Sequence, residues 1–171
     1  MRRLLLGLSA SLLLFNQPIS AQTAVVSGAR MTWYGNYAAG KTKVVKDPAS
    51  VTGTKVISSA ISPPSTNTDR IPLVSDARFG FGYELIGSPA DALVALKYIT
   101  RFPPPGVRDA ATGRLKRVKE NTYRDLAVGR KDLFCGEYFG EFKDPPAGTW
   151  TLQVWYGDRM LLEKSFAVGK P

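Results

Sequence analysis

Residues 149–168 read TWTLQVWYGDRMLLEKSFAV, and apolar side chains alternate with polar ones on both sides of Gly157-Asp158. The apolar positions before the Gly-Asp pair share one parity: Trp150, Leu152, Val154 and Tyr156. Those after it also share one parity: Met160, Leu162, Phe166 and Val168. A period of two is typical of half-buried β-strands, and a turn signal between two such runs predicts a β-hairpin.

The connection between the two strands decides which side chains share a face. A two-residue loop at Gly157-Asp158 would place Leu162 on the face opposite to Leu152 and split the apolar set. A three-residue connection, or a β-bulge, puts both sets on one side. We therefore predict an odd loop such as residues 157–159. The expected shared core consists of Trp150, Leu152, Val154, Leu162 and Phe166.

The same alternation recurs upstream, and helical periodicity is scarce. Strands are predicted near residues 25–33, 42–46, 55–61, 79–85, 93–102, 115–122 and 134–142. A helix over residues 89–97 is an alternative for one of these segments. Glycines alternate with the aromatic residues of 79–85, which indicates that something large packs closely against that strand. About eight short strands separated by turn signals predict an all-β sandwich or barrel.

The C-terminal hairpin also carries a resemblance. Residues 145–159, PPAGTWTLQVWYGDR, running on to Phe166-Ala167-Val168, resemble the closing hairpin of many immunoglobulin-like domains in secreted bacterial proteins. Some of those domains belong to families of unknown function. The resemblance implies an immunoglobulin-like antiparallel β-sandwich and implies no reaction, since this hairpin carries no catalytic residues in such domains. A jelly roll or a small β-barrel remains the alternative fold.

The first 21 residues have the composition of a secretory signal peptide. Arg2 and Arg3 precede the apolar run 4–15, and Ile19-Ser20-Ala21 supplies a small-residue cleavage site. The apolar run is shorter than the roughly 20 residues of a membrane span. We expect residues 1–21 to be removed and residues 22–171 to form one domain. Its expected location is the periplasm or the medium, with no membrane span in the mature chain.

The composition excludes several chemistries. The chain has no histidine and a single cysteine, Cys135. Ser-His-Asp and Cys-His catalysis, histidine-based zinc or copper sites, thiolate clusters and intramolecular disulfides therefore cannot occur. We expect Cys135 to be a buried small hydrophobe, with an intermolecular bridge or a reactive thiol as the alternative. No cofactor, metal site or catalytic residue is predicted.

The positive charge is concentrated in one segment. The formal net charge is +9, and residues 97–131 contain ten basic residues against three acidic ones. This segment is either a solvated face or a patch that binds an anionic polymer of the cell envelope. We expect residues 115–122 to be an exposed edge strand, because charged side chains deter pairing with other chains. The candidate binding residues are Arg114, Lys116, Arg117, Lys119 and Arg124.

Trp155 and one carboxylate pair are the other candidates. Trp155 does not share the parity of the predicted core, so it packs under a loop or is exposed and stacks on a sugar or a partner. Glu137 and Glu141 would lie about 13 Å apart on one strand, at roughly 3.3 Å per residue. A glycosidase pair requires about 5 to 9.5 Å. We therefore expect both glutamates to face solvent.

Together these features favour an exported, non-catalytic binding or accessory domain of the bacterial envelope. The expected partner is an envelope protein bound through an exposed sheet edge, or an anionic polymer bound through the basic segment. Nucleic acid is not expected, because export separates the protein from it. The alternative from another class is a small hydrolase that uses carboxylates and no histidine.

Overall fold

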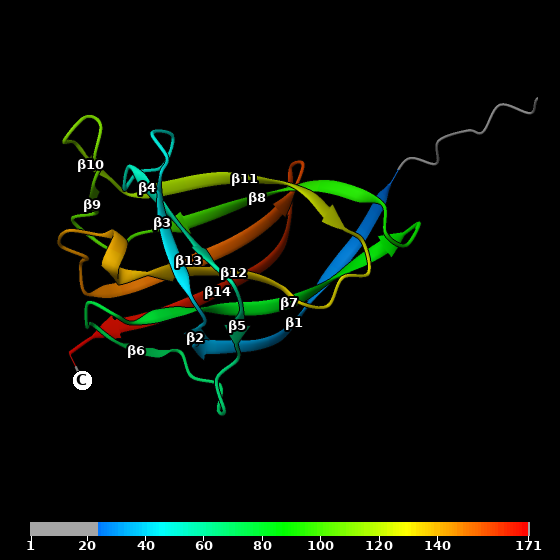
Figure 1. Ribbon diagram of the computed structural model, residues 1–171, viewed down its shortest axis with the longest axis horizontal. Coiled ribbons are helices and arrows are strands. Elements are labelled where there is room, and N and C mark those ends of the chain that lie inside the picture. Colours follow the sequence, from blue (N-terminus) through cyan, green and yellow to red (C-terminus); the bar gives the residue numbers. More distant parts are fainter. Residues whose placement is uncertain (1–23, 171) are drawn as a thin grey trace, which may run out of the picture.

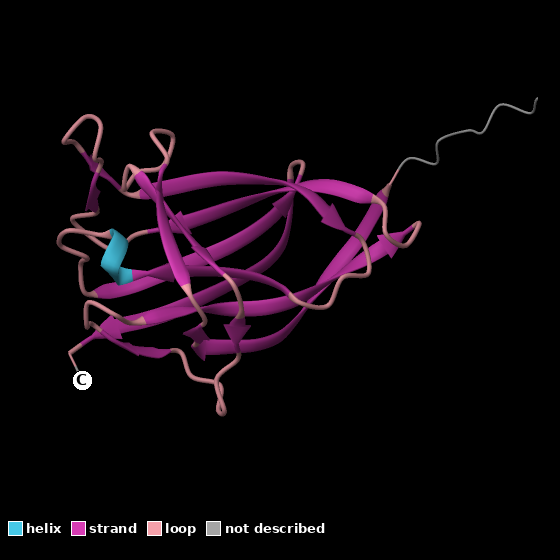
Figure 2. Cartoon of the chain, in the orientation of Figure 1, coloured by secondary structure: helices cyan, strands magenta, loops and turns pink. Residues whose placement is uncertain are grey.

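The computed structural model describes residues 24–170, and strands make up most of this part of the chain (Figure 2). Within the described residues, the only helix is the 3₁₀ turn η1 (Phe139–Glu141). No helix there is long and apolar enough to cross a bilayer. The predicted signal peptide lies outside the described residues.

Two sheets form the body of the fold (Figure 1). The smaller sheet has the order β1-β7-β12, formed by β1 (Val25–Asn36), β7 (Arg78–Ser88) and β12 (Leu133–Tyr138). The larger sheet has the order β11-β8-β13-β14-β6. Its strands are β11 (Val118–Ala127), β8 (Leu93–Arg101), β13 (Gly148–Tyr156), β14 (Arg159–Gly169) and β6 (Arg70–Pro72). Every pairing is antiparallel except the one between β14 and β6.

The hydrophobic core lies between the facing sides of the two sheets. Trp150 of β13 is fully buried, and its indole Nε1–H donates to the carbonyl of Pro146 at 2.9 Å. Four rings meet Trp150 edge-on, those of Phe79, Phe102, Phe139 and Phe142. The opposite parity of β7 carries glycines, and the indole of Trp33 covers Gly82 so closely that no Cβ fits there. The predicted close packing on this strand is therefore confirmed.

The C-terminal hairpin forms as predicted, but its loop differs. Tyr156 pairs with Arg159, so the loop is the two-residue Gly157-Asp158, and our odd loop is wrong. A β-bulge next to the turn adds one residue to β14, because Val154 pairs with Leu162 while Trp155 pairs with Met160. The extra residue restores the parity that an odd loop would have supplied. The five predicted core residues therefore share one face.

Residues 38–62 form a long arm that leaves the sandwich after β1 and returns before β6. We call this arm the strap. Its base is the pair β2 (Ala38–Ala39) and β5 (Ile61–Ser62), and its outer part is the hairpin β3 (Thr42–Lys46) and β4 (Thr54–Ser58). A further small hairpin joins β9 (Val107–Arg108) to β10 (Leu115–Lys116) at one end of the molecule (Figure 1).

Two other expectations need correction. The helix considered over residues 89–97 is absent, since β8 begins at Leu93. The strand expected over residues 134–142 ends at Tyr138 and continues as η1. The edge strand expected near residues 115–122 exists as β10 and β11, and β11 is an edge of the larger sheet.

Candidate functional site: a cleft between two sheet edges

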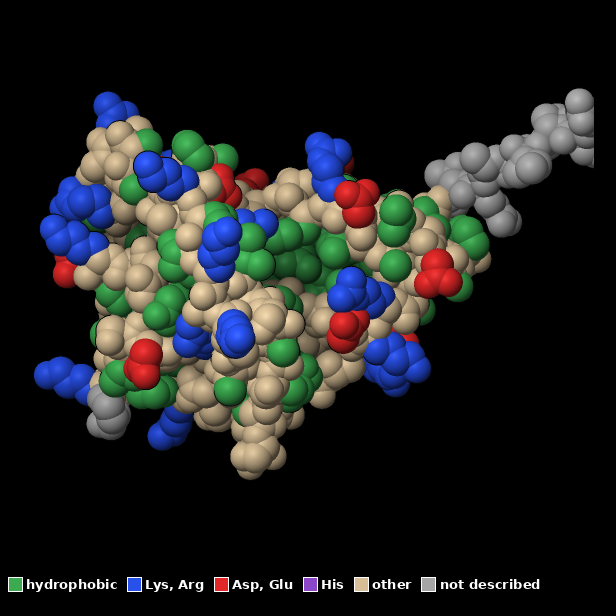
Figure 3. All heavy atoms as spheres, viewed as in Figure 1, with side chains coloured by type: hydrophobic (Ala, Val, Ile, Leu, Met, Phe, Trp, Pro, Cys, Tyr) green, Lys and Arg blue, Asp and Glu red, His purple; other side chains and the backbone are tan. Residues whose placement is uncertain are grey.

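A cleft of about 770 Å³ lies where β11, an edge of the larger sheet, faces β12, an edge of the smaller sheet. Strand β4 of the strap also lines it, and Figure 1 shows the hairpin β3–β4 crossing in front of the gap between β11 and β12. In Figure 3 the hollow has hydrophobic side chains in its depth and charged side chains around it. Its volume is typical of ligand sites, which span about 300–1,000 Å³.

Tyr98 and Tyr123 line one wall of the cleft, and Tyr83 lies behind this wall, fully buried. The hydroxyls of Tyr83 and Tyr98 lie 2.6 Å apart, and the ring centroids of Tyr98 and Tyr123 lie 4.5 Å apart. Burial raises the pKa of all three hydroxyls above the ordinary value of 10.0. All three tyrosines therefore keep their protons, and Tyr123, whose hydroxyl takes no part in the Tyr83–Tyr98 contact, offers a hydrogen-bond donor beside an aromatic surface.

A buried ion pair joins the two sheets at the floor of the cleft. Lys119 of β11 donates from Nζ to Oε2 of Glu137 on β12 at 2.6 Å. The hydroxyl of Thr100 donates to the other carboxylate oxygen of Glu137 at 2.5 Å. Lys119 is 8% exposed and Glu137 is 3% exposed, so water does not replace either contact. Both oxygens of Glu137 are therefore satisfied by the protein.

Glu141 on η1 lines the same cleft, but its carboxylate has fewer hydrogen-bond partners than that of Glu137. Its Oε1 atom is buried and has no hydrogen-bond partner among the described residues. Burial raises the pKa of the Glu141 carboxyl above its ordinary 4.5, and Glu137 raises it further. Lys119 and the backbone N–H of Val56 act in the opposite direction and only partly offset the burial. Glu141 thus holds a carboxylate that the surrounding protein does not fully match.

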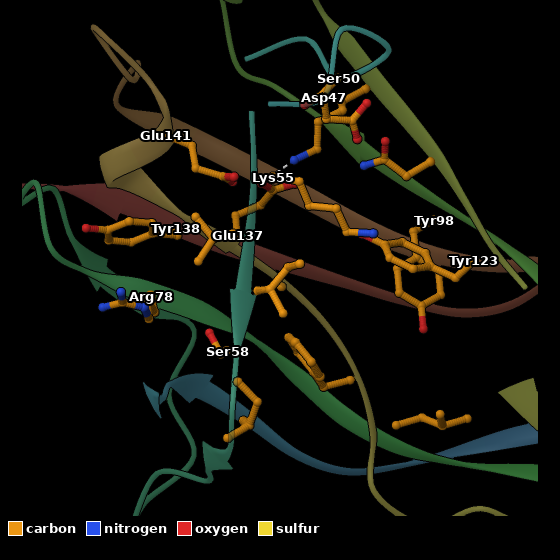
Figure 4. A pocket seen from close by; sticks show the side chains of 18 of the residues that line it. Asp47, Ser50, Lys55, Ser58, Arg78, Tyr98, Tyr123, Glu137, Tyr138 and Glu141 are labelled. Atoms are coloured by element: carbon orange, nitrogen blue, oxygen red, sulfur yellow. Dashed lines mark hydrogen bonds and ion pairs between the residues drawn. The ribbon is translucent and has the colours of Figure 1, made fainter. Parts of the chain in front are cut away.

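Two further cations around the cleft lie over aromatic rings. The ammonium of Lys55 sits 4.7 Å from the ring centroid of Tyr123, and the guanidinium of Arg78 sits 3.9 Å from that of Tyr138. Figure 4 shows Glu137 and Glu141 toward one end of the cleft and Tyr98 and Tyr123 toward the other, with Lys55 between them. The cleft therefore combines aromatic surface with paired and unpaired charges.

The strap is held where the chain leaves the sandwich, at the preceding residue Tyr37, and at its tip. At its base, the backbone N–H of Tyr37 donates to the carbonyl of Arg78 at 3.0 Å. At its tip, the carbonyl of Val51 accepts from the N–H of Ala110 at 2.8 Å, and Val51 is buried. The tip thus rests on the loop between β9 and β10. The middle of the strap is more exposed, since Val44 and Ile57 are 61% and 52% exposed.

The predicted basic residues divide into surface residues and one buried residue. Arg114, Lys116, Arg117 and Arg124 are exposed. Lys116 pairs with Asp109 at 2.5 Å, and this contact helps lower the pKa of the Asp109 carboxyl to about 2. Lys119 is inside the cleft and paired with Glu137, so it does not belong to a surface patch.

The exposed basic residues do not form one continuous group. Arg114 and Lys116 belong to the small hairpin β9–β10, and Arg117 lies directly after it, where its Nε–H donates to the carbonyl of Phe102. Arg124 lies seven residues further along β11, which corresponds to about 20 Å of extended chain. The four residues were expected to act together, and the structure brings only the first three to one end of the molecule.

Trp155 lies on the outer face of the larger sheet, as its parity predicts. It is half-buried, and its indole Nε1–H donates to the side-chain oxygen of Gln153 at 3.1 Å. The ammonium of Lys97 lies 5.6 Å from the ring centroid. Trp155 is therefore packed against polar neighbours on its own sheet and lies outside the cleft.

The expectation for the two glutamates was wrong, whereas the expectation for Cys135 is confirmed. Glu137 and Glu141 were expected to face solvent, and this is wrong, because Glu137 is buried and Glu141 is half-buried in the cleft. The parity of β12 carried a usable signal, since Glu137 alternates in phase with the buried Leu133 and Cys135. Cys135 is a buried free thiol whose pKa is raised by burial, as expected of a small hydrophobe.

Among residues 24–170, no group of three or more acidic or cysteine side chains gathers in a way that would hold a metal ion. The chemistry available in the cleft is instead hydrogen bonding by tyrosines, ion pairing and aromatic contact.

Comparison with known proteins agrees with the architecture. No family model matches the chain, and no curated protein matches it. A solved structure of an immunoglobulin-like protein from Pseudomonas aeruginosa matches with a TM-score of 0.51 and 23% sequence identity. The match covers 82% of this chain and 96% of that protein. The fold of this protein is therefore an immunoglobulin-like β-sandwich.

Proposed function

We propose that this protein is an exported, non-catalytic binding domain that holds an extended segment of a partner protein in the cleft. The segment lies along the outer edge of β11 and adds to the larger sheet as a further strand. Its side chains alternate between the cleft and the solvent.

The observation that carries this proposal is the meeting of two unpaired edges at one cleft. β11 pairs only with β8, and β12 pairs only with β7, among the described strands. A sheet edge presents unpaired backbone N–H and C=O groups, which an added strand satisfies. The strap crosses this region, and its own strands pair with each other.

The length of the usable edge is limited. The pairing of β11 with β8 is regular from Val118 to Tyr123 and then shifts before Leu126. Asp125 in this irregular stretch has a φ of 59°, in the left-handed region. A bulge interrupts the ladder on the free edge as well as on the paired one. The proposed partner segment is therefore about six residues long.

The hydrolase alternative has less support in the same cleft. Acid–base catalysis at a glycosidic bond needs two carboxyl groups that reach the substrate. Glu137 uses both oxygens for Thr100 and Lys119, so the candidate pair of Glu137 and Glu141 has only one free carboxylate. Among the described residues, Asp47 of the strap and Glu120 of β11 are the other unpaired acids that line the cleft. The arrangement favours binding over hydrolysis.

The proposal is tested by selecting short peptides from a random displayed library on the folded protein. We expect enriched peptides whose binding is lost in Asn121→Trp, because Asn121 is a half-buried residue that lines the cleft. The matched control is Thr149→Trp, an exposed position on the larger sheet and outside the cleft. Failure to enrich any peptide, or equal binding by both variants, contradicts the proposal.

Export is part of the proposal and rests on the N-terminal sequence. The basic start, the apolar run and the small-residue site of residues 1–21 support cleavage after Ala21. We expect the exported protein to begin near Gln22. N-terminal sequencing that still finds Arg2 in the exported protein contradicts this.

A second candidate function is the binding of an anionic polymer at the end of the molecule formed by β9 and β10. The observation in its favour is the exposure of Arg108, Arg114 and Arg117 beside Lys116, with Asp109 already held by Lys116. Such a surface attracts polyanions by charge alone. This candidate uses a surface separate from the cleft, so the two functions are tested independently.

A further inference from the structure

The four cations that line the cleft are all engaged by the protein. Lys119 pairs with Glu137, and Arg130 pairs with Asp132 at 2.6 Å. The other two are Lys55 and Arg78, each seated over a tyrosine ring. Lys119 and Arg130 are therefore already paired with carboxylates, whereas Lys55 and Arg78 form no ion pair among the described residues.

The carboxylates of the cleft outnumber these cations. Five acidic side chains line it: Asp47, Glu120, Asp132, Glu137 and Glu141. Two of them belong to the ion pairs just described, and the other three form no ion pair among the described residues. With four cations against five acids, the formal charge of the cleft lining is 4 − 5 = −1, although the whole chain carries a formal charge of +9.

Glu141 is the most constrained of the three unmatched acids. Its Oε1 atom is buried without a hydrogen-bond partner among the described residues, and η1 lies against strand β4 of the strap. An unmatched carboxylate away from water costs free energy until a donor or a cation reaches it. Asp47, at the tip of the strap, and Glu120, on β11, add negative potential without this constraint.

We propose that the segment bound in the cleft presents a lysine or arginine side chain to the carboxylate of Glu141. The inference rests on the proposed function, because the segment is the peptide added along β11. Aromatic rings are suited to such a side chain, as cations bind over their faces, and the cleft already holds two of its own cations in this way. A lysine or arginine side chain is positive, opposite in sign to the formal charge of the cleft, and it can lie over the aromatic rings that line the cleft.

The overall charge of the protein makes this preference selective. The basic exterior favours acidic partners at long range, whereas the cleft favours a basic side chain at short range. A partner segment that is acidic overall and carries one basic residue satisfies both conditions. A uniformly basic peptide satisfies only the second.

The inference is tested with two small probes of the same shape. N-acetylarginine amide carries a guanidinium, and N-acetylcitrulline amide replaces it with a neutral urea group. Each is titrated at neutral pH into the isotopically labelled protein, and backbone amide shifts are followed by NMR. We expect saturable shifts around Glu141, Tyr138 and Val56 with the arginine probe, and at least tenfold weaker binding of the citrulline probe.

Substitutions of single carboxylates show which of them binds the arginine probe. Glu141→Gln keeps the shape of the side chain and removes its charge, and we expect it to reduce arginine binding at least tenfold. Asp47→Asn should reduce binding less, because Asp47 acts only through the potential. The matched control is Glu84→Gln on β7, since Glu84 pairs with Arg30 outside the cleft. Equal binding of the two probes, or unchanged binding in Glu141→Gln, overturns the inference.

The result separates this inference from the proposed function. Arginine binding that depends on Glu141, without any peptide that adds to β11, supports the cation site and contradicts the strand addition. Peptides that bind along β11 with equal affinity when their basic residues are replaced by citrulline or norleucine support the strand addition and contradict the cation site.

Discussion

The ammonium of Lys119 lies 2.6 Å from the carboxylate of Glu137, so one buried ion pair ties β11 of the larger sheet to β12 of the smaller sheet. This contact closes the floor of the cleft at the place where the two sheet edges face each other. Thr100 holds the other oxygen of Glu137, which fixes the carboxylate between the sheets. The pair therefore sets the spacing of the two edges that we propose bind a partner.

Lys119→Met should destabilise the protein by about 3–5 kcal/mol, because it leaves Glu137 charged, buried and without its cation. The matched control is Arg130→Met, which breaks a pair with Asp132 whose two side chains are 50% and 73% exposed. An exposed pair of this kind contributes about 0–1 kcal/mol. Denaturant midpoints of the two variants check the difference, and equal midpoints would contradict the role given to Lys119.

Trp150→Ala should cost about 3–5 kcal/mol of unfolding free energy, the range for large buried aromatic side chains. Trp150 is fully buried among four aromatic rings, whereas Trp155 is half-buried on the outer face of the same strand. Trp155→Ala should therefore cost less. Urea unfolding of both variants tests the face assignment, which is inverted if Trp155→Ala is the more damaging change.

Glu141→Gln should make the protein more stable at neutral pH. Burial raises the pKa of Glu141 above 4.5 in the folded state, so the folded protein holds this proton more tightly than the unfolded chain does. The resulting stabilisation is complete below pH 4.5 and is lost as the pH rises through the raised pKa. Lys119 and Glu137 face the same carboxyl, and both keep their partners in the variant.

The measurement is the unfolding free energy of wild type and Glu141→Gln at several values between pH 4.5 and pH 8, with 4.5 as the ordinary pKa of the carboxyl. We expect the advantage of the variant to grow with pH. Glu84→Gln, which removes a carboxylate paired with Arg30, should show no such growth. A variant that loses stability at neutral pH, relative to wild type, contradicts the raised pKa.

Binding of long-chain polyphosphate should depend on Arg114, Lys116 and Arg117. Charge reversal of these three residues to Glu should abolish it, and circular dichroism checks the fold of the variant, because Lys116 pairs with the buried Asp109. The same binding should weaken steeply with salt, because the Debye length falls from about 10 Å at 0.1 M to about 3 Å at 1 M. Arg124→Glu serves as the control, about 20 Å along the strand. Binding that persists in 1 M salt or in the triple variant rules out this surface.

The strands that could be predicted from the sequence are those whose burial alternates cleanly. The C-terminal hairpin satisfies this condition and forms at the predicted place. Residues 42–46 also form the predicted strand, although their burial does not alternate. The predicted length of the hairpin loop was wrong, because parity alone does not distinguish an odd-numbered loop from a β-bulge beside a two-residue loop. Both solutions place Trp150 and Phe166 on the same face.

The cleft could not be predicted in the same way. It joins β4, β11, β12 and η1, which are distant in sequence and meet only because the strap folds back over the open side of the sandwich. Lys119 was expected on the surface because its neighbours in the sequence are charged, yet its side chain lies on the face of β11 that lines the cleft. Glu137 gave a clearer signal, because it alternates with Leu133 and Cys135, and its burial follows from that parity.

The most direct test of the central proposal is amide hydrogen exchange of the protein with and without a peptide selected on it. We expect the peptide to slow exchange at alternate amides between Val118 and Tyr123, because alternate residues of an edge strand direct their N–H groups outward. The amides of β1 and β6 should not change. Tight peptide binding that leaves exchange in β11 unaltered would contradict strand addition at this edge.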